Sequence, residues 1–178
     1  MFESQKVQHI IPKSSQDTLG IFLSNWRNFI VSKKIRHPFL DIACGDNILK
    51  KKKNGGIGID VINYGTADVL VKNFNTLPFK KNSFNSVAIV ASLNYFEKPQ
   101  QVLIEVSRVL KPCGILILTL FDPFIAKLWH IFREPWARNP SFSSDQLMVL
   151  SAGSGLILTE RHRFMLGMNN LYLLKKNE

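Results

Sequence analysis

Apolar residues recur every three or four positions between Leu19 and Ile30, a spacing that predicts an amphipathic helix. Ser14, Ser15 and Asp17 precede it, and these residue types commonly cap helices. We expect this helix to cover one face of a sheet. The residues expected to face that sheet are Leu19, Phe22, Leu23, Trp26 and Ile30.

Short, continuous apolar runs alternate with helical patterns along the rest of the chain. The predicted strands are Phe39–Ala43, Ile57–Val61, Asp68–Val71, Ser86–Ala91, Ile115–Leu120, Leu156–Phe164 and Leu171–Lys175. The predicted helices are Pro99–Leu110, ended by Lys111 to Gly114, and Ser144–Leu150; Gly167, Asn169 and Asn170 join the last two strands. Strands that alternate with helices predict a doubly wound α/β fold, with a mostly parallel sheet covered on both faces and closed by a C-terminal pair of strands.

The chain has 178 residues, of which 46% are hydrophobic, so it can bury the core of one domain and is short for two. No apolar run approaches the roughly 20 residues of a membrane-spanning helix, and residues 1–13 lack the pattern of a secretory signal. We therefore expect a cytoplasmic protein. Cys44 and Cys113 are too few for a disulfide framework or a metal site, and no metal is expected.

The chain has 23 lysine and arginine residues and 13 aspartate and glutamate residues, which gives a net charge of +10. This excess of positive charge suggests an anionic binding partner. The densest run is Lys50 to Lys53, with smaller clusters at Lys33, Lys34 and Arg36. Two interpretations remain open for this charge. It is either ordinary solvated surface or a dedicated patch for phosphate or membrane.

The segment from Asp41 to Asn47 is the turn after the first predicted strand, where ligands of open α/β sheets usually bind. Gly45 tolerates a positive φ, and small neighbours let a ligand approach the backbone. Asp60 ends the second strand, and an acid there can hydrogen-bond both hydroxyls of a ribose. Its alternative role is that of a turn former.

These segments resemble class I S-adenosylmethionine-dependent methyltransferases of the type 11 group. The resemblance rests on Leu40 to Asn47, Gly58 to Asp60, Leu77-Pro78-Phe79, and Glu105 followed by Arg108 to Gly114. It implies a Rossmann-like, three-layer αβα domain. Within that domain, residues 1–36 are a helical cover, 37–122 hold the cofactor, and 123–178 form an acceptor cover and closing strands, one of them antiparallel.

The resemblance also implies the ligands and their site. S-adenosylmethionine is the cofactor and S-adenosylhomocysteine the product. The residues expected to bind the cofactor are Asp41, Ala43, Cys44, Gly45, Asp60, Val61, Asn73, Phe74 and Val90. Tyr95 is the candidate catalytic residue, to orient the acceptor or take its proton, and its alternative role is packing.

The chain departs from the family pattern in the turn and in the adenine site. Ala43 and Asn47 replace glycines, Cys113 replaces the first glycine of a Pro-Gly-Gly turn, and Asn73 replaces an aspartate that recognises the adenine amino group. An amide can still accept that hydrogen bond but carries no charge. Residues 63–66 resemble a loop where relatives have a crossover helix, which would leave that side of the site open.

The acceptor stays open between a small molecule, a lipid-linked intermediate and a sugar intermediate. The aromatic segment Phe121 to Phe142, with His130, Arg133 and Arg138, would suit an acceptor that has an apolar part and a negative group, although core packing explains its apolar residues equally well. A nucleic-acid methyltransferase is less favoured, because the lysine run is far in sequence from these aromatic residues. A non-catalytic binding or interaction module is the other alternative. The sequence leaves the oligomeric state undetermined.

Overall fold

The computed structural model describes residues 18–132 and 141–177, and only the backbone of residues 129–132. The helices are α2 (Thr18–Ser32), α3 (Ile48–Lys53), α4 (Pro99–Val109), α5 (Pro123–Phe132), α6 (Ser144–Ser151) and the 3-10 helix η1 (Leu93–Tyr95). The strands are β1 (Phe39–Ile42), β2 (Ile57–Asp60), β3 (Val69–Leu70), β4 (Phe84–Val90), β5 (Leu110–Phe121), β6 (Leu156–Phe164) and β7 (Asn169–Lys176).

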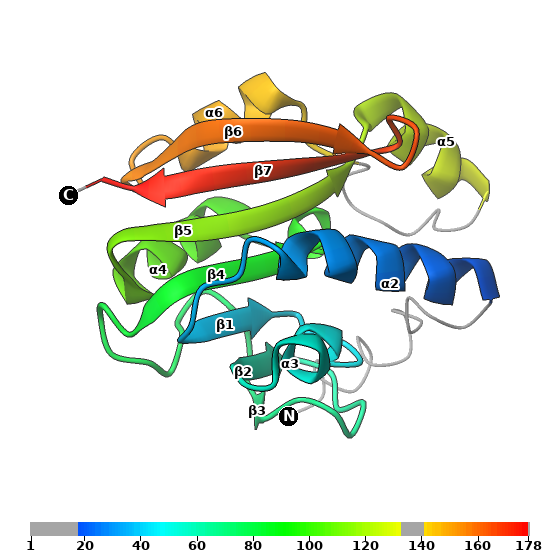
Figure 1. Ribbon diagram of the computed structural model, residues 1–178. Helices are drawn as coiled ribbons and strands as arrows, with labels where there is room; N and C mark the ends of the chain where they lie inside the picture. The colour runs from blue at the N-terminus through cyan, green and yellow to red at the C-terminus, as the bar shows by residue number, and fades with distance from the viewer. Residues whose placement is uncertain (1–17, 133–140, 178) are drawn as a thin grey trace.

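The strands form one sheet in the order β3-β2-β1-β4-β5-β7-β6 (Figure 1). Strands β3, β2, β1, β4 and β5 are mutually parallel, and β7 is antiparallel to both of its neighbours. This confirms the predicted doubly wound sheet with an antiparallel C-terminal strand. The chain order reverses between β1 and β4, and such a reversal opens a crevice at the carboxyl ends of the two strands.

Helices cover both faces of this sheet, as the three-layer prediction requires. In Figure 1, α2 and α3 lie in front of the strands and α4 and α6 lie behind them. On the front face, Val31 of α2 and Leu49 of α3 pack in one buried cluster with Ile117 of β5. On the back face, Leu103 of α4 and Leu147 of α6 belong to a larger cluster.

The connections after β2 are shorter than in an ordinary α/β fold. Residues 61–68 join β2 to its parallel neighbour β3, and they form turns and bends without a helix. The predicted loss of the crossover helix is therefore confirmed. No helix covers residues 71–83 between β3 and β4 either, so this edge of the sheet is held by loops.

Two predicted boundaries were wrong. Lys111 to Gly114 do not form a separate turn, because β5 begins at Leu110 and already pairs there with Phe84; the register shifts between Phe84 and Ser86 and absorbs the irregular residues. Asn169 and Asn170 belong to β7 and pair with β6. In both places backbone pairing extends a strand into residues whose types favour turns.

The predicted inward face of α2 was wrong at three positions. Leu23 is buried, but Leu19, Phe22 and Trp26 are exposed. The buried positions of α2 are Gly20, Leu23, Ser24, Arg27, Asn28 and Val31. The physical reason is the place of the helix: only its C-terminal part lies over the apolar sheet, and the rest faces the polar crevice at the strand ends.

None of the described helices is both long and apolar enough to cross a membrane.

Candidate functional site

A cleft of about 100 Å³ lies at the carboxyl ends of β1 and β4, beneath α2. It brings together six of the predicted site residues, which are Asp41, Ala43, Cys44, Gly45, Val90 and Tyr95. Helix α2 supplies further lining residues, which are Gly20, Leu23, Ser24, Arg27 and Asn28.

The turn after β1 keeps a glycine-like backbone where the sequence has lost glycines. Ala43, Gly45 and Asn47 have φ values of 56°, 51° and 53°, all in the left-handed region. That conformation costs residues other than glycine roughly 1–2 kcal/mol, although asparagine tolerates it better. The replacements therefore preserve the path of the turn at some cost in stability.

Asn47 also ties this turn to the next loop. Its side-chain amide donates to the carbonyl of Thr66 at 2.9 Å and to Oδ2 of Asp68 at 3.3 Å. A Cβ atom on Gly58 would lie only 2.5 Å from the Asn47 side chain. Asn47 can therefore occupy this place only because residue 58 is glycine.

The Asp60 carboxylate contacts the turn after β1 directly. Its Oδ2 accepts the N–H of Gly45 at 2.9 Å, and its Oδ1 accepts the N–H groups of Val61 and Ile62 at 2.8 and 3.1 Å. A carboxylate has about four acceptor positions, so about one remains for an incoming hydroxyl. Gly45 and Asp60 thus lie at the same end of the sheet, in direct contact.

The remaining predicted residues lie outside the cleft. Phe74 is buried, with its ring centroid 4.9 Å from that of Phe96. Asn73 is exposed, and its Oδ1 accepts the N–H of Asn75 at 2.9 Å. Val61 is half-buried next to Asp60. The adenine-binding role of Asn73 and Phe74 stays a prediction.

Asp41 is a buried carboxyl group that faces the cleft. Burial, and secondarily the nearby charge of Asp60, raises its pKa from 3.8 to about 8. Among the described residues, its Oδ1 has no hydrogen-bond partner. A buried acceptor of this kind fits the ammonium group of an amino acid, which would donate to it. The same burial raises the pKa of the Cys44 thiol, so Cys44 is not an activated nucleophile.

Arg27 is a site residue that the sequence analysis missed. It lies on α2, is 7% exposed and lines the cleft. Its guanidinium carbon lies 5.4 Å from the centre of the Phe121 ring, at the end of β5. In the sequence, Arg27 is a charged residue one helical turn after Leu23 in a largely apolar helix. Such a residue indicates a buried polar site only when the buried face of the helix is already known.

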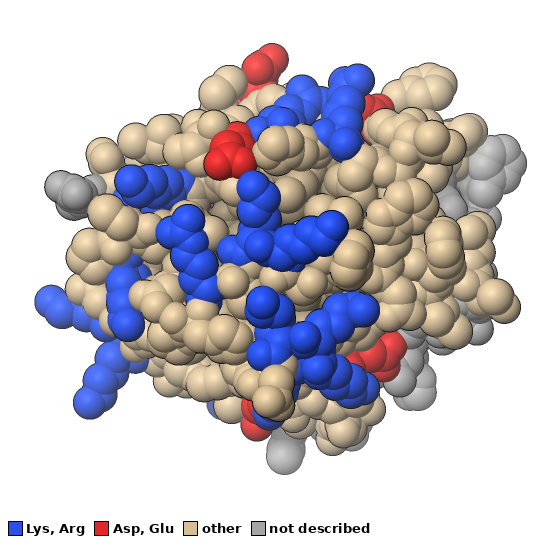
Figure 2. Space-filling view, in the orientation of Figure 1, with Lys and Arg blue, Asp and Glu red and all other residues tan. Residues whose placement is uncertain are grey.

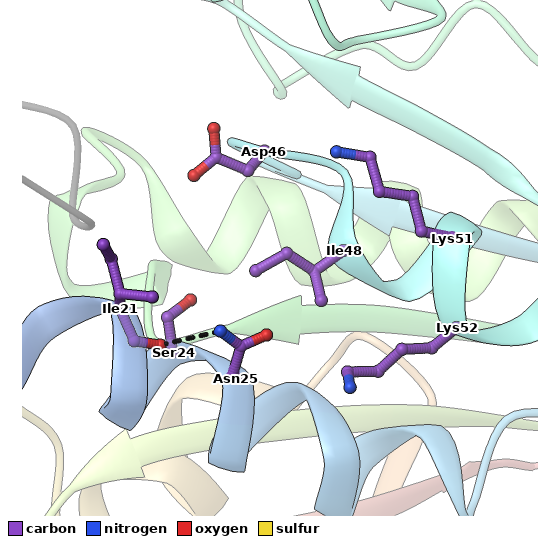
Figure 3. Close-up of a pocket in the computed structure, with 7 residues that line it drawn as sticks. All are labelled: Ile21, Ser24, Asn25, Asp46, Ile48, Lys51 and Lys52. Carbon is purple, nitrogen blue, oxygen red and sulfur yellow. Dashed lines mark hydrogen bonds between the residues drawn. The ribbon is translucent and has the colours of Figure 1, made fainter. Parts of the chain in front are cut away.

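A second pocket of about 610 Å³ lies between α2 and α3 (Figure 3). Its lining residues are Ile21, Ser24, Asn25, Asp46, Ile48, Lys51 and Lys52. It adjoins the cleft, since Ser24, Asp46 and Ile48 line both spaces. In Figure 3, Lys51 extends toward Asp46 and Lys52 toward Asn25. The lysine run thus has two environments, because Lys50 forms an ion pair with Asp68 instead.

Comparisons with known proteins support the resemblance seen in the sequence. Residues 40–118 match the family described as Methyltransferase domain. A 113-residue stretch is 34% identical to protein MJ1252 of Methanocaldococcus jannaschii, covering 57% of this chain and 44% of that protein. A 114-residue stretch is 36% identical to the ubiquinone/menaquinone biosynthesis C-methyltransferase UbiE of Wigglesworthia glossinidia brevipalpis, covering 62% of this chain and 41% of the enzyme. The chain thus spans less than half the length of these two relatives.

The fold is also similar to that of a solved methyltransferase structure. The SAM-dependent methyltransferase TM1293 of Thermotoga maritima superposes with a TM-score of 0.69 over 86% of this chain and 90% of that structure, at 19% identity. At this identity the likeness concerns the fold. Together with the match of residues 40–118 to the methyltransferase-domain family, it shows that the chain has the fold of class I S-adenosylmethionine-dependent methyltransferases.

Proposed function

We propose that this chain transfers the methyl group of S-adenosylmethionine to a small-molecule acceptor. The observation that carries the proposal is the pairing of Asp41 and Arg27 in one cleft beside Gly45. The methionine end of the cofactor bears one ammonium and one carboxylate group. Asp41 can accept from the ammonium and Arg27 can donate to the carboxylate, so the cleft offers a partner for each charged group.

The remaining residues would hold and align the reactants. The cofactor supplies an electrophilic methyl group on a sulfonium ion, and alignment of the acceptor with that carbon can supply much of the acceleration. Asp60, in contact with Gly45, would bind the ribose, and Val90, which lines the cleft, would contact the methionine end. Tyr95 lines the same cleft and would orient the acceptor or take its proton.

We infer an acceptor with an apolar part. Relatives are named as C-methyltransferases of ubiquinone and menaquinone biosynthesis, and one as a demethylmenaquinone methyltransferase, at 26% to 39% identity. The residues that follow β5 agree with this class, because Phe124 and Leu128 of α5 are exposed rather than packed in the core. These side chains are available to an apolar ligand close to Phe121 at the end of β5.

Calorimetric titration with S-adenosylmethionine and S-adenosylhomocysteine tests the binding half of this proposal. We expect saturable binding that weakens about tenfold to a hundredfold in Arg27→Met, because a hydrogen bond to a charged group contributes about 1.5–3 kcal/mol. Asp60→Ala should weaken it as well. Asp145→Ala, at an exposed position on α6, is the matched control and should bind like the parent. Absence of saturable binding by the parent chain would contradict the proposal.

A methyl-transfer assay with demethylmenaquinone tests the acceptor class. Incorporation of labelled methyl into the quinone, lost in Arg27→Met and kept in Asp145→Ala, is the expected result. Saturable cofactor binding with no transfer to demethylmenaquinone or to other apolar phenols would instead favour the non-catalytic binding module.

A further inference from the structure

The outward face of α2 is apolar although it faces solvent. Its exposed large hydrophobic residues are Leu19 (50% exposed), Ile21 (46%), Phe22 (57%), Trp26 (37%) and Phe29 (49%). The rings of Phe22 and Trp26 touch edge to face, with centroids 5.6 Å apart. The helix contains no acidic residue. Surface helices of soluble proteins ordinarily show the opposite pattern, with charged residues outward.

The packing of α2 explains why polar residues are buried and leaves the outward apolar face unexplained. Ser24, Arg27 and Asn28 turn inward because they line the cleft. Nothing in that arrangement requires aromatic residues on the opposite side. A contiguous exposed apolar patch of this kind usually marks an interaction surface.

Cationic side chains border this patch. The Nζ of Lys33 lies 4.4 Å from the centre of the Phe29 ring at the C-terminal end of α2. Lys51 and Lys52 lie across the 610 Å³ pocket, whose α2 wall is formed by Ile21, Ser24 and Asn25. Figure 2 shows the same arrangement, with uncharged side chains over much of α2 and blue side chains over α3 below it.

Among the described residues, two acidic groups lie beside the lysines that border the patch. Glu160 pairs with Lys34 at 3.3 Å and neutralises that cation. Asp46 lines the pocket opposite Lys51. Lys33 and Lys52 have no ion pair with a described residue. The surface therefore combines an apolar stripe with a positive border.

We propose that this surface, formed by the outward side chains of α2 together with Lys33, Lys51 and Lys52, docks the protein on an anionic lipid bilayer. Helices that lie in the membrane interface bury aromatic and aliphatic side chains at the acyl boundary and hold lysines at the headgroups. The pocket between α2 and α3 would receive a lipid phosphate between Lys51 and Lys52. This docking does not depend on the proposed methyl transfer.

The same observations argue against two other partners for this surface, a second copy of the chain and a nucleic acid. A second copy of the chain would bring lysines against lysines around the patch, because a two-fold interface joins the same surface to itself. A nucleic acid would use Phe22, Trp26 and the lysines, but aliphatic Leu19 and Ile21 give no stacking surface for bases. Acyl chains satisfy both kinds of apolar side chain.

Co-sedimentation with phosphatidylcholine vesicles, with and without phosphatidylglycerol, tests the proposal. We expect the parent chain to sediment with the anionic vesicles and much less with the neutral ones. Phe22→Ser/Trp26→Ser should lower the affinity for anionic vesicles at least tenfold, through the loss of buried aromatic area. Met148→Ser/Val149→Ser, which changes exposed apolar residues on α6, is the matched control and should sediment like the parent.

A charge variant separates the two parts of the surface. Lys51→Ala/Lys52→Ala should weaken binding to anionic vesicles about fivefold per lysine and leave the weak binding to neutral vesicles unchanged. None of the six substituted residues lines the cofactor cleft, so all variants should keep the parent's affinity for S-adenosylhomocysteine. A variant that fails to bind it would be excluded as misfolded.

Four results would overturn the proposal. The first is that the parent chain is absent from the anionic vesicle pellet, and the second is that the α6 control loses as much vesicle binding as Phe22→Ser/Trp26→Ser. The third is that the parent self-associates and Phe22→Ser/Trp26→Ser abolishes this association. The fourth is that the parent binds RNA in a salt-sensitive way and Phe22→Ser/Trp26→Ser abolishes RNA binding but keeps vesicle binding. Vesicle binding that appears only when residues 1–17 are removed would assign the patch to that segment. A failure of methyl transfer would leave every one of these measurements intact.

Discussion

The carboxyl group of Asp41 is largely protonated at pH 7, because its pKa is about 8. It lies next to Asp60, whose charge opposes a second carboxylate in the same buried region. An ammonium group placed against Oδ1 of Asp41 would favour the ionised form. Binding of an amino-acid ligand in this cleft is therefore linked to release of a proton.

We predict that S-adenosylhomocysteine displaces up to about one proton from the protein at pH 7. The measurement is calorimetric titration in two buffers with different ionisation enthalpies, since the difference in apparent heat gives the number of protons released. Asp41→Asn should abolish the release. Equal heats in the two buffers for the parent chain would show that Asp41 is not the ammonium partner.

The same shift makes the stability of the free protein depend on pH. The folded pKa of Asp41 lies above its unfolded value of 3.8, so the folded state binds more protons between pH 3.8 and about 8. The contribution of Asp41 to the free energy of unfolding is therefore fully present below that window and falls as the pH rises through it. In Asp41→Asn this part of the slope should disappear from denaturant titrations.

Individual residues differed in how well the sequence predicted them. Gly45 and Asp60 could be predicted, because the carboxyl ends of neighbouring parallel strands meet at one edge. Arg27 could not, since helical spacing alone favoured the stripe of Leu19, Phe22 and Trp26 as the buried face. The side of a helix that faces a polar crevice does not show in its hydrophobic pattern.

At the scale of elements, two of the motif residues on which the family resemblance rests, Glu105 and Arg108, hold α4 against the loop that contains Leu77 and Phe79. Both oxygens of Glu105 bind the Arg108 guanidinium, at 2.8 and 2.7 Å, and Oε2 also accepts the N–H of Leu77 at 2.8 Å. Arg108 donates in turn to the carbonyls of Leu77 and Phe79, at 2.9 and 2.8 Å. The Leu-Pro-Phe segment is thus anchored where no helix connects β3 to β4.

We predict that Arg108→Ala lowers the free energy of unfolding by about 2 kcal/mol, because it leaves Glu105 without its charged partner. Urea titration followed by circular dichroism measures the change. Arg163→Ala, at an exposed position on β6, should change stability by no more than about 0.5 kcal/mol. Equal effects of the two substitutions would show that the contacts of Arg108 add little.

Elements were predicted best where strands are fully buried. Strands β1, β2 and β4 read as apolar runs because they lie inside a parallel sheet, and their places were predicted within two residues. The start of β5 was missed, because Pro112, Cys113 and Gly114 favour turns and only pairing with β4 makes them part of a strand. Such pairing is a long-range effect with no local signal.

At the scale of the whole molecule, the cleft is built from one edge of the sheet and the helix that covers it. The sheet contributes the turn after β1 and the end of β4, and α2 closes the cleft from the front (Figure 1). A ligand bound there would contact both parts. It would therefore couple the stability of α2 to that of the sheet.

We predict that S-adenosylhomocysteine at a hundredfold excess over its dissociation constant stabilises the protein by about 2.7 kcal/mol. For a chain of this size the melting temperature should rise by about 5–10 °C. Hydrogen exchange should slow in α2 as well as in residues 43–47, and the β6–β7 hairpin, which does not line the cleft, should serve as the unaffected internal reference. Protection confined to the turn would mean that α2 takes no part in binding.

The overall architecture followed from the sequence because alternation of strands and helices leaves few arrangements for a chain of this length. The sequence did not predict that α3 lies beside α2, which brings Lys51 and Lys52 across a shared pocket from Ile21 and Asn25 of α2. Only the three-dimensional path of the turn places them together.

The Asn47 side chain fills the volume that a methyl group on residue 58 would need, so the two positions behave as one steric unit. A larger residue at 58 is compatible with this fold only after the amide at 47 has been given up, along with its tether to Thr66 and Asp68. Changes at the two sites therefore have a fixed order. A smaller residue at position 47 would have to come first, and a larger residue at position 58 second.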